Sequence, residues 1–193
     1  MGVVKVTVSN FHLSAPSWTP EQGKVYLQKM QALALKPSIV QLRLDAEQER
    51  QLCSAIAPRI AQINQKLASC LLQCQHCFYP QQRLSIQIFA APFAQHLNID
   101  GLCNLNTDPI TILIDVGRII PQHWLSAIAH EYTHAQVGIA GHHQAFRETL
   151  THLCLGLGLT PPPHDLPESE LQNWPPCQPT PDPLAFWLGT LTD

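Results

Sequence analysis

Two kinds of apolar spacing divide the chain into predicted strands and predicted helices. Alternation of apolar and polar positions, with many β-branched residues, is typical of a strand that buries one face. This pattern and short β-branched runs predict strands over residues 3–9, 39–44, 83–90 and 110–114. Apolar residues three and four positions apart share one face of a helix. They predict helices over residues 21–35, 45–78, 118–137 and 143–157.

The longest predicted helix carries two local markers. Asp45 is followed three residues later by Gln48, a pairing that satisfies free backbone groups at a helix start. Pro58 has no backbone N–H, so we expect it to split or kink this helix. Residues 101–108 are rich in turn-forming side chains and predict a loop between two strands. Strands and helices packed on one core predict an α+β domain over residues 1–160.

The composition changes abruptly after Thr160. Nine of the 17 prolines lie in residues 161–193, and no Lys or Arg follows Arg147. This segment is an acidic, proline-rich C-terminal tail. Its apolar side chains favour docking on the domain over free solvation, and they include Trp174, Phe186, Trp187 and Leu188.

Charge and cysteine content narrow the possible partners and compartments. Only 13% of the 193 residues are charged and the net charge is −3, so nucleic-acid binding by the isolated chain is not expected. No apolar run is long enough to span a bilayer, and the first ten residues lack the apolar core of a signal peptide. Seven cysteines form a poor disulfide framework. We therefore expect a cytoplasmic protein with reduced thiols and no membrane contact.

The chemistry of the chain is concentrated in the segment HEYTH at residues 130–134. On a helix, His130 and His134 lie on one face and can direct two imidazoles at a single ion. Glu131 would then reach a water molecule on that ion. This arrangement is typical of a zinc hydrolase, in which zinc acidifies the water and the glutamate accepts its proton.

A catalytic zinc needs three protein ligands and an open position, so a third ligand must lie outside this helical turn. Gly138 is suited to end the helix, after which the chain can return His142 or His143 to the pair. We prefer His142, and Glu148 on the following helix is a weaker alternative. The extended motif HExxHxxGxxH would require a histidine at Ala140, so that class does not fit.

These residues resemble the signature of the SprT-like (Spartan-type) zinc metallopeptidases, in which HExxH is followed by GHGxxF or a close variant. The chain reads HEYTH and GHHQAF, with His143 in place of the second family glycine. The resemblance implies a zincin-like fold, zinc ligands His130, His134 and His142, and catalytic Glu131. It also implies that Phe146 matches the family aromatic. Resemblance to minimal zincins implies that the strand near residues 111–115 lines the cleft and pairs with an extended peptide substrate, and a plain core strand is the alternative interpretation.

A second group of ligand-type residues lies in the long predicted helix. Cys70, Cys74 and Cys77 have the CxxxCxxC spacing of certain iron–sulfur sites, and His76 could add a fourth ligand. The three cysteines also continue an apolar stripe at helical spacing. We therefore interpret them as core residues, in preference to a cluster or a structural zinc site.

The sequence leaves two functions open. The first is a zinc metallopeptidase that hydrolyses a protein or peptide substrate with Glu131 as general base. The second is a non-catalytic, zinc-stabilised scaffold or assembly factor whose proline-rich tail occupies the cleft or recruits a partner. Glu131 favours the enzyme, because a purely structural metal site has no use for a base.

Overall fold

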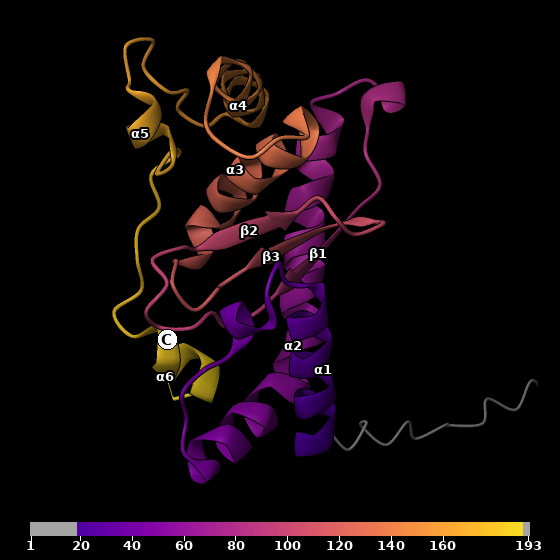
Figure 1. Ribbon diagram of the computed structural model, residues 1–193, viewed down its shortest axis with the longest axis vertical. Helices are drawn as coiled ribbons and strands as arrows, with labels where there is room; N and C mark the ends of the chain where they lie inside the picture. Colours follow the sequence, from indigo (N-terminus) through magenta and orange to yellow (C-terminus); the bar gives the residue numbers. More distant parts are fainter. Residues whose placement is uncertain (1–18, 191–193) are drawn as a thin grey trace, which may run out of the picture.

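A three-stranded mixed sheet packs against helices in the computed structural model, which describes residues 19–190 (Figure 1). The strands are β1 (Ile86–Ala90), β2 (Gly101–Asn104) and β3 (Ile110–Ile114). The helices are α1 (Pro20–Leu33), α2 (Ala46–His76), α3 (Trp124–Val137), α4 (Gln144–Leu157), α5 (Glu168–Leu171) and α6 (Pro183–Leu188). Short 3₁₀ turns cover Pro37–Val40, Pro80–Gln82 and Pro121–His123. This architecture confirms the α+β class.

The strand order β1–β3–β2 makes β3 the central strand. β1 runs parallel to β3, with Ile88 opposite Ile112, and β2 runs antiparallel to β3, with Leu102 opposite Leu113. Within residues 19–190, no strand pairs with the outer edge of β2. β2 therefore presents free backbone groups at one side of the sheet.

The two faces of the sheet contribute to different apolar clusters. Leu102 and Leu113 join Met30 of α1 in a smaller apolar cluster. Ile112, on the opposite face, joins the main core formed with α2 and α3. Figure 1 shows the long helix α2 passing behind the sheet, and α3 lying above it. The main core therefore holds α3 against the sheet, where α3 contacts β2 and β3.

Several boundaries differ from the predictions. Residues 39–44 contain no strand, because Pro37 begins a 3₁₀ turn that ends at Val40. Asp45 caps α2 as expected. Pro58 does not split this 31-residue helix, whose neighbouring residues Ile56 and Ile60 are buried in the core, but the axis of α2 changes direction along its length in Figure 1, in line with the expected kink. The segment 101–108 begins with strand β2 instead of a loop. The predicted strand over residues 3–9 lies outside the described residues.

The strand prediction over residues 110–114 is confirmed, whereas that over residues 83–90 holds only from Ile86 onward. The helix predicted over residues 118–137 begins only at Trp124, after the turn at Pro121–His123. No helix of the described chain has the length and apolarity needed to cross a membrane.

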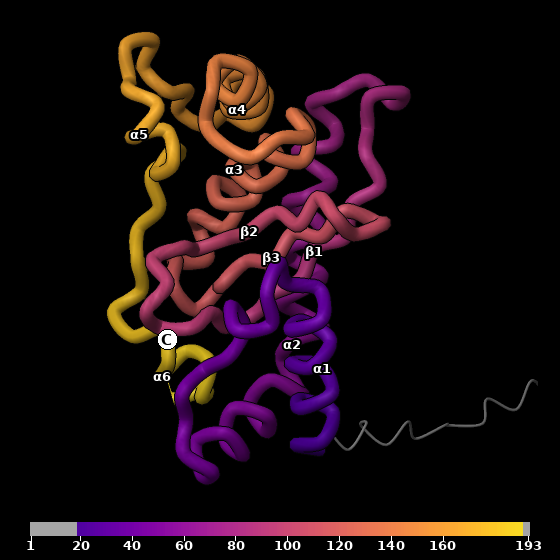
Figure 2. Tube along the Cα trace, in the orientation of Figure 1, coloured from indigo at the N-terminus to yellow at the C-terminus, as the bar shows by residue number. Residues whose placement is uncertain are grey.

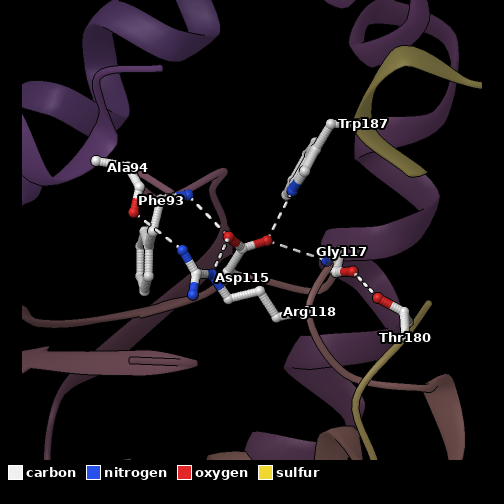
Figure 3. A network of polar contacts seen from close by, with 7 residues as sticks. All are labelled: Phe93, Ala94, Asp115, Gly117, Arg118, Thr180 and Trp187. Atoms are coloured by element: carbon white, nitrogen blue, oxygen red, sulfur yellow. Dashed lines mark hydrogen bonds and ion pairs between the residues drawn. The ribbon is translucent and has the colours of Figure 1, made fainter. Parts of the chain in front are cut away.

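The C-terminal tail packs against the domain through a buried polar network (Figure 3). Asp115, directly after β3, is only 2% exposed. It accepts hydrogen bonds from the Trp187 indole (2.7 Å), the Phe93 and Gly117 amides (2.8 and 3.1 Å) and the Arg118 guanidinium (3.1 Å). Burial raises the pKa of Asp115, and the bonds from Phe93, Trp187 and Arg118 oppose that shift. The network joins α6 to the end of the central strand.

Candidate metal centre

Three histidines converge where α3 ends and the chain turns back toward α4. One ring nitrogen from each of His130, His134 and His142 lies within 4.8 Å of the other two, an arrangement that could hold a metal ion. The Nε2 atoms of His130 and His142 are 3.1 Å apart. α3 supplies the first two rings, four residues apart on one face.

The turn after α3 brings His142 to this pair. Gly138 ends α3 in the left-handed conformation, with φ of 74°, and Gly141 has φ of 99°. Both values favour glycine, because a side chain is strained in this region. Two such residues within four positions reverse the chain over a short distance. The sequence signal for His142 was thus the glycine pair as much as the histidine.

Phe146 supports the three rings from α4. It is 1% exposed, and its ring centroid lies 5.0, 4.6 and 4.6 Å from those of His130, His134 and His142. The Phe146 ring restricts the orientations of the imidazoles and keeps water from one side of them. Phe146 therefore packs against all three imidazole rings.

The pKa values of the three histidines are lowered, which favours the neutral imidazoles that bind a cation. Burial lowers the pKa of His130 to about 3 and that of His134 to about 4. Burial also lowers the pKa of His142. Neutral imidazoles carry the lone pair that a metal requires, and three converging nitrogen donors fit a divalent transition metal with room for a further ligand. The residues present therefore fit the expected group.

Glu131 lies beside the triad at the junction of α3 and β2. Its side chain is 8% exposed, lines the cleft and has no hydrogen-bonding or ion-pair partner among residues 19–190. Burial, with a smaller contribution from the Asp100 charge, raises its pKa to about 8. A Cβ atom at Gly101 would lie 2.8 Å from Cγ of Glu131, so this glycine makes room for the carboxylate.

The cleft has a volume of about 890 Å³ and two distinct walls. One wall is β2 with the residues before it, including Asp100. The other is the tail segment from Gln172 to Cys177. The carbonyl oxygen of Trp174 lies 2.8 Å from Nδ1 of His130. Asp100, Gly101 and the Trp174 backbone were not predicted as parts of the site, because only contacts between distant segments mark them.

The alternative ligands lie apart from the triad. His143 directly precedes α4, is exposed, and its Nδ1 is 3.6 Å from a Glu168 carboxylate oxygen. Glu148 is exposed and accepts a 2.8 Å hydrogen bond from Gln144. Tyr132, next to Glu131 in the sequence, is fully buried in the main core.

The three cysteines of α2 do not form a comparable centre. In the described chain, the histidine triad is the one group of three or more ligand-type side chains that converge. Cys74 is fully buried in the main core, and Cys70 and Cys77 pack against it half-buried. Burial raises the pKa of all three thiols. They pack as the core residues that their apolar stripe predicted.

Comparison of the chain with protein-family models, curated proteins and solved structures returned no match.

Proposed function

We propose that the protein is a zinc metallopeptidase of zincin-like fold, related to the SprT-like family, that hydrolyses peptide bonds. The observation that carries this proposal is a buried, unpaired Glu131 carboxylate in an open cleft beside three convergent histidines. His130, His134 and His142 would hold the zinc. When bound, zinc would supply Lewis-acid chemistry to a carbonyl group and lower the pKa of water.

Glu131 is placed to act as the general base. Its carboxylate has no partner in the described chain to neutralise it, and Gly101 leaves space beside it on the side of β2. In the proposed reaction Glu131 accepts a proton from the attacking water and donates it to the leaving amine. A glutamate buried without a partner is costly for a purely structural role, which supports a catalytic one.

An extended peptide fits the wall formed by β2. The resemblance suggested that residues 111–115 pair with substrate, but both edges of β3 are already paired, so that expectation is wrong. Of the two outer strands, β2 lies at the cleft, where its residues Gly101 and Leu102 line the wall. Main-chain pairing along such an edge is a common mode of peptide recognition. We therefore assign the substrate to β2.

The rim of the cleft supports a peptide or protein substrate over nucleic acid. Leu35, Ile99 and Ile139 line the cleft and are 52%, 38% and 49% exposed. Exposed apolar side chains around a cleft are typical of a surface that binds apolar groups. The lining includes Asp100 and Glu131 but no Lys or Arg, so it offers nothing to neutralise a phosphate backbone.

The second candidate is a non-catalytic, metal-stabilised scaffold. Contact of the tail with His130 favours it, because a segment at the site could exclude substrate. Three protein ligands, and no fourth among residues 19–190, favour the enzyme, since structural zinc sites are usually closed by four.

The deciding experiment is Glu131→Gln, with Glu148→Gln as a matched control on the exposed face of α4. We expect Glu131→Gln to retain about one zinc per chain by elemental analysis, and to lose peptide hydrolysis by about 10²- to 10⁴-fold. Glu148→Gln should retain both properties. A wild-type protein that binds zinc and cleaves no member of an unfolded-protein and peptide panel would support the scaffold instead.

A further inference from the structure

The tail segment 172–180, named here the strap, runs from α5 to α6 along the side of the molecule (Figure 2). It is held at several points beside α3. The Ile120 amide donates to the Gln178 carbonyl (3.1 Å), and the Thr180 amide donates to the Arg118 carbonyl (2.8 Å). The Gln178 amide donates to Nδ1 of His123 (2.7 Å). The strap is therefore a fixed part of the cleft wall.

The contact between the strap and His130 determines which ring nitrogen carries the proton. A carbonyl oxygen can only accept, so at 2.8 Å from the Trp174 carbonyl the Nδ1 atom of His130 must donate. In a neutral imidazole the other nitrogen, Nε2, then carries a free lone pair. That nitrogen faces Nε2 of His142, 3.1 Å away, inside the triad. The strap thus leaves the metal-facing nitrogen of His130 free.

The Trp174 carbonyl is itself held in place by independent contacts. The Trp174 indole donates a hydrogen bond to the Thr160 carbonyl (3.0 Å), and its amide donates to the Leu171 carbonyl (3.0 Å). The indole also packs on the cluster that contains Phe146 and Leu150. One apolar cluster therefore orients both Phe146, which contacts all three rings, and the strap residue bonded to His130.

We infer that the strap is part of the metal centre, and that the Trp174 backbone carbonyl fixes the ring orientation and the Nδ1–H tautomer of His130 for metal binding. Trp174 is a positioning residue, since it acts through His130. This inference rests on the proposed function where it concerns the metal. The Nδ1–H tautomer of His130 is expected whether or not a metal binds. Partners of this kind commonly affect metal affinity by about 10- to 100-fold.

A purely structural explanation makes a different prediction. If the bond only satisfies a half-buried ring nitrogen, then weakening the strap should lower stability and leave the metal affinity and the tautomer unchanged. The chain offers a control for this. Trp187→Phe removes the indole bond to Asp115 and loosens the tail at α6, away from the triad.

The test uses the full-length chain and compares Trp174→Ala, Trp174→Phe and Trp187→Phe. Zinc affinity is measured by competition with a chromophoric chelator, and the His130 tautomer by ring-nitrogen NMR on the metal-free protein. We expect Nδ1–H in the wild type, a mixture of tautomers in Trp174→Ala, and about 10- to 100-fold weaker zinc binding. Trp174→Phe keeps the aromatic packing and should show a smaller loss.

Trp187→Phe should lower the melting temperature and keep both zinc affinity and tautomer. The inference is overturned if wild-type His130 carries its proton on Nε2, a result that needs no folded variant. It is also overturned if Trp174→Ala folds with unchanged affinity and tautomer, or if Trp187→Phe weakens zinc binding as much as Trp174→Ala. Failure of the wild type to bind zinc would refute the proposed function, and the tautomer alone would then decide this inference.

Discussion

Two helices of this protein carry ligand-type side chains four residues apart, and they use them differently. α3 carries His130 and His134, and α2 carries Cys70 and Cys74. In α3 the helix ends at Gly138 and the chain reverses, so that His142 returns to the pair. In α2 the third cysteine is only the C-cap of the same helix.

A spacing of four residues along one helix brings two ligand-type side chains together. In α3, a reversal of the chain after the helix brings the third. Cys77 continues the helical path of Cys70 and Cys74, and its C-cap φ of −71° gives no reversal. Burial also differs. Cys74 is 0% exposed within the core, whereas the histidines border an open cleft. A metal centre needs ligand side chains that converge on one point and that the ion can reach.

The largest effect that would sharpen this comparison is expected from His134→Ala. Removing one of three nitrogen donors should weaken zinc binding by at least about 100-fold. The binding free energy of zinc in small structural sites is about 10–16 kcal/mol, and it is shared among few ligands. Zinc competition with a chelator measures the change. Equal affinity of wild type and variant would show that the triad is not the metal site.

A smaller effect, on stability instead of metal, is expected from replacing Cys70, Cys74 and Cys77 together by alanine. Lost packing, mainly at buried Cys74, should lower the free energy of unfolding by about 2–3 kcal/mol. Denaturant unfolding measures this, and elemental analysis should give unchanged zinc. Loss of metal, or of a visible absorbance band, would show that the thiols are ligands after all.

The smallest effect is expected from His143→Ala. This side chain is exposed and lies outside the convergent group, so zinc affinity should stay at the wild-type value. His142→Ala, its neighbour, should weaken binding by about 100-fold for the same reason as His134→Ala. The reverse pattern in the same competition assay would move the third ligand to His143.

Local sequence signals predicted the parts of the site that lie within one segment. His130, Glu131 and His134 share a helical turn, and Gly138 marks its end. The choice of His142 over His143 needed the path of the turn, which the sequence constrained only through Gly138 and Gly141. The expectation that residues 111–115 have an edge free for pairing was wrong, because a short apolar run does not reveal whether its strand is central or at an edge.

The sequence by itself determined the α+β class, the helix that presents the histidine pair and the apolar face that buries the cysteines, because each depends on periodicity within one element. Tertiary structure alone decided that β2 is the edge strand at the cleft, that Gly101 makes room for Glu131 and that the tail reaches His130. These features join residues far apart in the chain. They follow from packing on a shared core, for which local spacing carries no signal.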